Sequence, residues 1–341
     1  MESPKKYHLR VDRSGNGERI DTYISRHVSN LARSQVKKLI EEGFILLNNA
    51  RPKPNEKLKQ GQILEIEIPP KSRDLKPAQI PLSILYEDAY LLAVDKPAGL
   101  VVHPSETTNE PTLVEALLSQ RPEIRNVGER RRPGLVHRLD KETSGVLLIA
   151  KTVEIQRALM ALFASHRVKK YYVAITASAP KENKGTVETY ITRHPVYRQI
   201  YTVSDKSGRR SVTLYRVLKR FGTIASCLMA HPLTGRTHQV RVHLRHLKAP
   251  ILCDKLYSSR KNLFLSELYG KKPEPSEKPL LERQALHSFS ISFLHPLRGD
   301  YLRIKAPLPS DLRHTLTALS SAFPSQPPRN GSVQHPPPTN K

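Results

Sequence analysis

The sequence predicts an α+β protein with two domains, a small α/β module followed by a larger domain rich in strands. Its 341 residues are enough for more than one hydrophobic core. Residues 18–70 alternate between helical and strand-like apolar patterns, and residues 71–81 contain prolines but no apolar period, as in a semi-rigid linker. Residues 82–322 contain many strand-length apolar runs with helical patterns between them. We expect residues 1–17 to form an N-terminal extension and residues 323–341 a disordered tail rich in Pro and Ser.

Two helices and two strands are expected in the small module. Apolar residues fall at helical spacing over residues 20–28 and again in the next segment, where Ser34 can cap the helix and Gly43 ends it. Residues 44–47 predict a short strand, and residues 63–68 alternate between apolar and polar side chains as a half-buried strand does. A module of about fifty residues is marginal alone and is expected beside a larger domain.

The larger domain is organised around residues 134–151, a polar loop followed by a buried strand. Val146 to Ala150 is an uninterrupted apolar run of strand length. The loop before it places several charged side chains between two glycines, and a loop anchored on a strand can hold reactive groups rigidly. Asp140 is our candidate for the reacting group. On spacing alone, an ion pair with Arg138 or a turn cap is the commoner role for such an aspartate, so both interpretations stay open.

The chain is strongly basic. Fifty-six Lys and Arg against thirty-one Asp and Glu give a net charge of +25, which attracts polyanions, so nucleic acid is the expected partner. A membrane surface is the competing partner, but we find no amphipathic helix with bulky apolar anchors, and the chain has no Trp. The two cysteines, Cys227 and Cys253, are not spaced as metal ligands, and no histidine spacing indicates a metal. These spacings lead us to expect no metal. Because no run is long and apolar enough to span a bilayer, we expect a cytoplasmic protein.

Further motifs follow one another along the chain. The central loop reads His-Arg-Leu-Asp and then Thr-Ser-Gly over residues 137–145, residues 169–174 read Lys-Lys-Tyr-Tyr-Val-Ala, and residues 236–241 read Arg-Thr-His-Gln-Val-Arg. Together with Arg-Gln-Ala-Leu-His-Ser over residues 283–288 and an opening strand pair over residues 83–104, they resemble the RluA-type RNA pseudouridine synthases. The resemblance covers nearly the whole chain except its two ends. It implies a large mixed, mainly antiparallel β-sheet flanked by helices, the pseudouridine synthase fold.

The resemblance also implies roles for particular residues. Asp140 would act as nucleophile or base at the sugar of uridine, and Arg241 would pair with it, keeping it ionised and oriented. Tyr172 would stack on the uracil that is flipped out of the RNA and could accept the proton from C5. Leu286 would pack under that base, and Arg138 would fill the gap left in the RNA stack. This chemistry calls for no cofactor.

Some polar residues near these motifs are given structural roles. Asp95 and Lys96 most simply form an ion pair in a turn, and His103 a structural hydrogen bond. His137 is expected to hold the central loop rather than to react. Because side chains alternate along a strand, Tyr171 belongs to the opposite face from its neighbour and is expected to pack.

The small module resembles an S4 RNA-binding module over residues 19–23 and 32–43, and at Asn48, Asn49 and Gly61. Its RNA contacts would fall on or next to the polar face of the second helix, at Arg33, Gln35, Lys37 and Lys38. A solvated face is the alternative for such charges, and the resemblance together with the net charge favours RNA.

The sequence departs from the family pattern after the Gln-Val-Arg motif. Where the family tends to have Gly-His-Pro-Ile and then Gly-Asp, this chain has Lys248-Ala249-Pro250-Ile251 and Cys253-Asp254. Serine stands at 288 in place of the customary alanine. The changes at residues 248, 249 and 253 fall in the loop that follows the motif, and the departures leave the catalytic set unchanged.

The function implied is the isomerisation of uridine to pseudouridine in structured RNA. An S4-like module joined to this family suggests large-subunit ribosomal RNA, and transfer RNA remains open. The competing functions are a non-catalytic RNA-binding or ribosome-assembly protein on the same fold and an RNA N-glycosylase that uses the same carboxylate. We expect a monomer whose partner is RNA.

Overall fold

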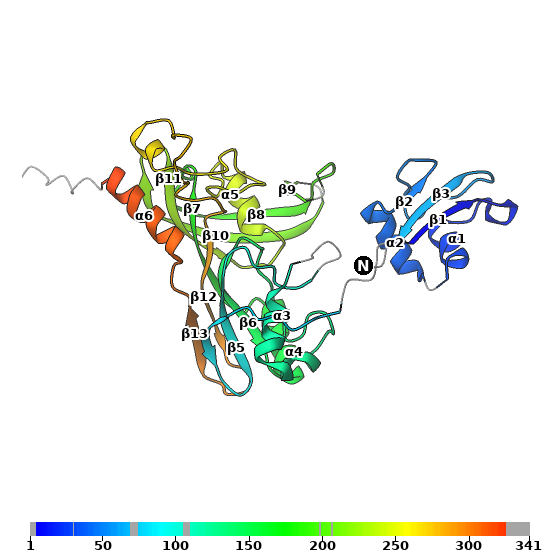
Figure 1. Ribbon diagram of the computed structural model, residues 1–341, viewed down its shortest axis with the longest axis horizontal. Helices are drawn as coiled ribbons and strands as arrows, with labels where there is room; N and C mark the ends of the chain where they lie inside the picture. Colours follow the sequence, from blue (N-terminus) through cyan, green and yellow to red (C-terminus); the bar gives the residue numbers. More distant parts are fainter. Residues whose placement is uncertain are drawn as a thin grey trace, which may run out of the picture. The chain divides into compact units, whose positions relative to one another are not determined.

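The computed structural model describes residues 5–29, 31–68, 74–104, 110–197, 199–205 and 207–324. The chain divides into two compact units, coloured along the sequence in Figure 1, which we describe separately. The first unit contains residues 1–74 and 104–109, and the second contains the rest of the chain. The tail expected over residues 323–341 lies outside the described residues except for its first two positions.

The first unit is a three-stranded antiparallel sheet with two helices. Its strands are β1 (Lys5–Arg10), β2 (Ile45–Leu47) and β3 (Ile63–Ile68), in the order β1-β3-β2. A short 3-10 turn, η1 (Arg13–Gly15), precedes α1 (Ile20–His27) and α2 (Arg33–Glu42). The apolar stripes of both helices and the inner face of β3 share one buried cluster, which explains why the helical and alternating patterns coexist in this short stretch.

Two expectations for this unit are corrected. Residues 5–10 do not belong to a separate extension, because β1 pairs with β3 along its whole length, from Lys5 opposite Ile68 to Arg10 opposite Ile63. The second helix begins at Arg33, so Ser34 lies inside it and is not its cap. Gly43 ends that helix in the left-handed conformation, as expected.

The second unit is built on one ten-stranded sheet in the order β4-β5-β6-β12-β7-β11-β10-β8-β9, with β13 paired to β12. The strands are β4 (Ser83–Glu87), β5 (Leu91–Lys96), β6 (Ser144–Ala150), β7 (Lys169–Thr176), β8 (Lys184–Arg193), β9 (Tyr201–Ser204), β10 (Arg209–Phe221), β11 (Ala225–Pro232), β12 (Leu286–Leu294) and β13 (Tyr301–Lys305). Neighbouring strands of the described sheet are antiparallel except β6 and β12, which are parallel over two residue pairs, Ser144 with His287 and Gly145 with Ser288. The expected mixed, mainly antiparallel sheet is confirmed.

Helices cover different parts of this sheet. The helices of the second unit are α3 (Leu113–Gln120), η2 (Pro122–Asn126), α4 (Val153–Ala164), α5 (Gln239–His246), η3 (Ser266–Tyr269) and α6 (Ser310–Ala322). Figure 1 shows α3 and α4 beside β5 and β6, and α6 beside β10 and β11. These two groups form separate hydrophobic clusters, and Tyr172 packs against both of them. The predicted catalytic tyrosine therefore lies where the two cores meet.

Part of the predicted linker belongs to the second unit. The backbone N–H of Ala78 donates to the carbonyl of Glu115 at 3.0 Å, and the side chain of Gln120 donates to the carbonyl of Ile80 at 2.8 Å. These bonds attach residues 75–81 to α3. Within the described ranges, no helix has the length and apolar character that crossing a membrane requires.

Candidate active site

Two glycines fix the polar loop of residues 134–145 against the sheet. Gly134 has a φ of 69°, and a Cβ there would lie 2.6 Å from the carbonyl oxygen of Ala150. Gly145 has a φ of 107°, and a Cβ there would lie 2.2 Å from the carbonyl oxygen of Ser288. Any side chain at either position would push the loop off the strands, so glycine is required at both ends.

His137 supports this loop from inside. Its Nε2 accepts the backbone N–H of Leu148 at 2.9 Å, and its ring stacks on Phe163 with centroids 4.8 Å apart. Burial lowers the pKa of His137 to about 3, so the ring is neutral at physiological pH. This geometry agrees with the structural role expected for His137.

Lys96 also supports this loop, through the carbonyl of Lys141. The expected ion pair between Lys96 and Asp95 is therefore wrong. The Lys96 side chain is completely buried. Its Nζ donates to the carbonyl oxygens of Pro97, Leu100 and Lys141 at 2.7, 2.8 and 2.9 Å. Burial lowers the pKa of Lys96 to about 7. The three carbonyl acceptors favour the charged form, because only an ammonium group has three protons to donate to them. Lys96 thus ties β5 to the residue that follows Asp140.

Arg241 connects two carboxylates that are distant in sequence. It lies on α5, where its side chain is only 7% exposed. Its Nη1 donates to Asp140 Oδ2 at 2.9 Å, while Nε and Nη2 donate to the two oxygens of Asp254 at 2.7 and 2.9 Å. Asp254 has no exposed surface, whereas the Asp140 side chain is 21% exposed. The buried carboxylate of Asp254 therefore fixes the guanidinium, which contacts the accessible carboxylate of Asp140 through its remaining nitrogen.

His238 and Tyr257 complete the surroundings of Asp140. His238 precedes α5 with a φ of 56°, and its Nε2 lies 3.9 Å from Asp140 Oδ2. Burial lowers the pKa of His238 to about 4, so this contact joins a neutral ring to a carboxylate and is not an ion pair. The hydroxyl of Tyr257 accepts the backbone N–H of Tyr201 at 2.8 Å and lies 2.8 Å from His238 Nδ1.

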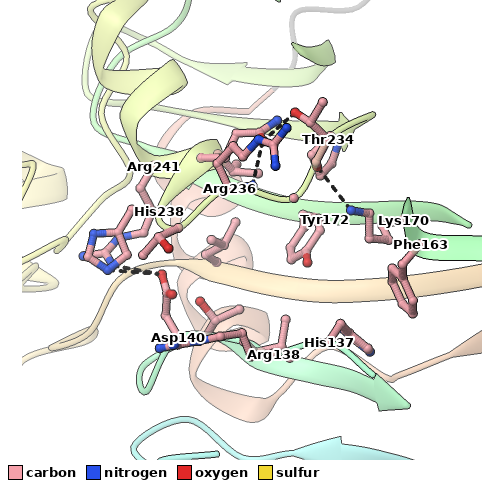
Figure 2. Close-up of a pocket in the computed structure, with 18 of the residues that line it drawn as sticks. His137, Arg138, Asp140, Phe163, Lys170, Tyr172, Thr234, Arg236, His238 and Arg241 are labelled. Carbon is pink, nitrogen blue, oxygen red and sulfur yellow. Dashed lines mark hydrogen bonds and ion pairs between the residues drawn. The ribbon is translucent and has the colours of Figure 1, made fainter. Parts of the chain in front are cut away.

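Asp140, His238 and Arg241 line a pocket of about 540 Å³, within the range of small-molecule sites. Tyr172 and the buried Leu286 form part of its wall. Asp140, Arg138 and Arg241 lie around it (Figure 2). The five residues expected to act on the nucleotide are thus brought together. Burial raises the pKa of Tyr172 to about 12, so its hydroxyl keeps its proton at neutral pH. Tyr171 lies outside this lining and stacks on His231 instead, as alternation along the strand predicts.

The residues expected to contact RNA in the first unit are all exposed on α2. They are Arg33, Gln35, Lys37 and Lys38. The Nη2 of Arg33 lies 3.6 Å from Asp21 Oδ2, and Lys38 Nζ lies 3.7 Å from Glu42. The Oε1 of Gln35 accepts the backbone N–H of Ala32 at 2.9 Å, so part of this side chain is used to begin the helix.

The two departures from the family pattern fall on unusual backbone positions. Lys248 has a φ of 59° and Cys253 a φ of 57°, both in the left-handed region that favours glycine. These are the positions where the family tends to have glycine. The loop keeps a conformation suited to glycine although the residues differ, and Asp254 still reaches Arg241.

Sequence reasoning missed several residues of this site. Asp254 was noted only as part of a departure and His238 only as part of the motif at residues 236–241. Tyr257 and Lys170 were not assigned a role. The signal for Asp254 was available, because a buried arginine that serves one exposed carboxylate commonly needs a second acid to satisfy its fork of donors. In the part of the chain that the structure describes, no group of three or more His, Cys, Asp or Glu could hold a metal ion.

The fold and the pocket together define an enzyme-like site, with an accessible carboxylate paired to a buried arginine, in a strongly basic protein. A model of the RNA pseudouridylate synthase family matches residues 90–246. Proteins named ribosomal large subunit pseudouridine synthase D, from Xanthomonas campestris pv. campestris and Xylella fastidiosa, are 38% and 39% identical to this chain, with 91% and 89% of this chain and of the relative covered. The solved structure of human RNA pseudouridylate synthase domain containing 4 is similar with a TM-score of 0.55 and 27% identity, over 70% of this chain and 92% of that one.

The chain therefore belongs to the RluA-type family of RNA pseudouridine synthases. It is an RNA pseudouridine synthase, and RNA is its substrate. The resemblance seen in the motifs is confirmed by relatives that align over most of the chain.

Proposed function

We propose that the protein isomerises specific uridines of large-subunit ribosomal RNA to pseudouridine, with Asp140 as the reacting carboxylate. The observation that carries this proposal is the contact between Asp140 and Arg241 in a nucleotide-sized pocket. The choice of RNA is supported by the names of the relatives from Xanthomonas and Xylella. A net charge of +25 suits a large structured polyanion.

Asp140 is suited to attack at the sugar. Pseudouridine formation breaks the bond between N1 and C1′ of uridine, turns the base over and joins C1′ to C5. A partly exposed carboxylate held by a buried guanidinium is oriented and open on one side to the ribose. Arg241 itself is fixed by Asp254, so the carboxylate does not need to reorganise when the sugar arrives.

Tyr172 and Leu286 are suited to retain the uracil after the bond is broken. The aromatic ring offers a stacking surface worth about 1–3 kcal/mol per base, and Leu286 offers an apolar contact beside it. The raised pKa of Tyr172 favours stacking over a role as proton acceptor, because a protonated phenol must first lose its own proton. Another group or water then takes the proton from C5.

Arg138 is suited to the step that exposes the uridine. It is exposed at the pocket, where a planar guanidinium can enter the RNA stack as the base leaves it. In the first unit, we propose that the exposed polar side chains of α2 contact RNA phosphates and increase affinity. We further propose that the protein acts in the cytoplasm as a monomer and needs no metal.

The variant Asp140→Asn tests this function. We expect it to fold and to bind ribosomal RNA as the wild type does, with no detectable isomerisation, because an amide is not a nucleophile. Pseudouridine mapping of ribosomal and transfer RNA, from cells with and without the gene, identifies the substrate. If cells without the gene lose pseudouridines in transfer RNA alone, then transfer RNA is the substrate and ribosomal RNA is not. Mass spectrometry separates isomerisation, which leaves the RNA mass unchanged, from glycosylase action, which removes a base. Substantial turnover by Asp140→Asn would falsify the assignment of the carboxylate.

A further inference from the structure

Two cations on the wall of the pocket are not used by the chemistry described above. Lys170 and Arg236 both line it, and among the described residues neither forms an ion pair with a carboxylate. Arg241, by contrast, has its charge matched by two acids. Burial and then the nearby charge of Arg236 lower the pKa of Lys170 to about 8, so the amine is still mainly charged at neutral pH. Keeping two such cations together is unfavourable unless an anion comes between them.

The amine of Lys170 is held in place rather than free to move. Its Nζ donates to the carbonyl oxygen of Thr234 at 3.2 Å and lies 5.9 Å from the centre of the Phe163 ring. An ammonium group has three donors, so two remain for a ligand. On the other side of the loop, the Nε of Arg236 donates to the carbonyl oxygen of Arg210 at 3.3 Å, which leaves its terminal nitrogens for other partners.

Gly235 keeps the space beside this amine open. Its backbone does not have a positive φ, so the conformation does not require glycine. The one atom that a Cβ at this position would approach is Lys170 Nζ, at 3.5 Å. The missing side chain therefore leaves room next to the charge.

The position of Lys170 relates it to the substrate. Lys170 and Tyr172 are two residues apart on β7 and point to the same face, about 7 Å apart along the strand. In Figure 2, Lys170 and Asp140 lie on opposite sides of the pocket with Tyr172 between them. A nucleotide whose base meets Tyr172 and whose sugar meets Asp140 carries a phosphodiester on each side of that sugar.

We propose that Lys170 and Arg236 form a subsite for the phosphodiester adjoining the extruded uridine. The inference rests on the proposed function, since it takes the uridine to bind at Asp140 and Tyr172. A full negative charge matches two cations better than a neutral uracil carbonyl does, and a compact ammonium next to a guanidinium is a common way to hold phosphate. The subsite fixes the backbone of the flipped nucleotide while the base is detached from the sugar. It is a binding subsite and takes no part in bond breaking.

Binding of mononucleotides tests the subsite without RNA turnover. The full-length protein is titrated with uridine, uridine 5′-monophosphate and uridine 3′-monophosphate, and affinity is followed by NMR. We expect one of the two nucleotides to bind about tenfold or more tightly than uridine, and its identity tells which phosphate is held. This advantage should disappear in Lys170→Met, fall in Arg236→Met and be largely restored in Lys170→Arg.

A matched control is provided by the neighbouring lysine. Lys169 is exposed and does not line the pocket, so Lys169→Met removes the same charge without touching the subsite. We expect the advantage of the phosphorylated nucleotide to remain in this variant. Equal binding of uridine and both nucleotides by the wild type, no binding up to about 10 mM, or an advantage that survives in Lys170→Met would each overturn the subsite.

A second measurement uses RNA, and its main comparison is made with the wild-type protein, so that comparison does not depend on folding of the variants. RNA that the wild type isomerises is synthesised with a neutral methylphosphonate at the phosphate identified above. We expect KM to rise about tenfold for this RNA with wild-type protein, with kcat changed less than threefold, and to rise no further in Lys170→Met. An unchanged KM for the methylphosphonate RNA would reject the phosphate as the ligand of Lys170. If no RNA is isomerised at all, the proposed function fails, while the mononucleotide titration still decides the subsite.

Discussion

Asp254 binds both ends of the fork of Arg241, at 2.7 and 2.9 Å, and so leaves a single guanidinium nitrogen facing Asp140. Arg241 would otherwise be free to form a bidentate pair with the candidate nucleophile, which would use both carboxylate oxygens. With Asp254 behind it, Arg241 contacts only Oδ2 of Asp140 at 2.9 Å. The other oxygen of Asp140 remains available for a sugar.

The first prediction concerns Asp254. The variant Asp254→Asn keeps the shape of the side chain but leaves a buried arginine with one carboxylate, so we expect a loss of roughly 3 kcal/mol in the free energy of unfolding. Rotation of the guanidinium toward Asp140 should reduce kcat by about tenfold or more. Urea unfolding and single-turnover kinetics measure these effects. Asp300→Asn, on the surface, should change neither, and a normal kcat in Asp254→Asn would contradict the orienting role.

The second prediction concerns Tyr257 as a positioning residue. Its hydroxyl accepts the N–H of Tyr201, so its own proton is available for His238 Nδ1, which places the imidazole proton on Nε2, toward Asp140. Tyr257→Phe should lower kcat about fivefold with little change in KM. It should also shift the tautomer of His238, which ¹⁵N NMR detects. Tyr171→Phe, on the opposite face of β7, is the control, and an unchanged tautomer in Tyr257→Phe would reject this explanation.

The third prediction concerns the exposed Lys248, whose φ is 59°. A left-handed conformation costs a non-glycine residue about 1–2 kcal/mol, and the extra freedom of glycine in the unfolded chain offsets part of this. Lys248→Gly should therefore raise the free energy of unfolding by about 0.5–1 kcal/mol, as measured by urea unfolding. Lys248→Ala keeps the unfavourable backbone and should change little. A glycine variant less stable than the alanine variant would contradict the prediction.

The fourth prediction concerns acid. Burial lowers the pKa of His137 to about 3 and those of His243 and His287 to about 4, against an ordinary value of 6.5. The unfolded chain therefore binds more protons than the folded one below pH 6.5, and stability is lost as the pH falls from about 6.5 toward 4. Each histidine contributes up to about 1.4 kcal/mol per pH unit.

Urea unfolding at about pH 7.5 and about pH 5 measures this loss. In His287→Gln, the loss of unfolding free energy between these two pH values should be smaller by about 2 kcal/mol, because the histidine contributes only below about pH 6.5. An unchanged dependence would show that His287 does not titrate differently in the two states.

Much of the fold followed from local patterns and from the order of motifs. The alternation in residues 63–68 became β3, because burial on one face leaves a period of two, and the apolar run 146–150 became part of β6, because burial on both faces leaves a continuous apolar run. The strand β1 was missed, since only Tyr7 and Leu9 interrupt its polar residues and an edge strand needs few apolar side chains. Its pairing with β3 depends on residues more than fifty positions away, which no local pattern contains.

The site was predicted where motifs name a residue and missed where distant contacts define it. Asp140, Arg241 and Tyr172 were found by their motifs and meet at one pocket. Lys96 was expected to form an ion pair with its neighbour, and the contact with the carbonyl of Lys141, 45 residues away, appears only in the folded protein. The role of Asp254 likewise becomes visible only through its contact with Arg241, 13 residues earlier in the chain.

Asp140 and Arg241 are 101 positions apart, and the hydrogen bond between them closes a long segment of chain. Such a contact forms only after the loop it closes has lost most of its freedom. During refolding from urea, circular dichroism should thus recover before turnover does. A newly made copy of the protein stays inert toward RNA until both halves of its large sheet have come together.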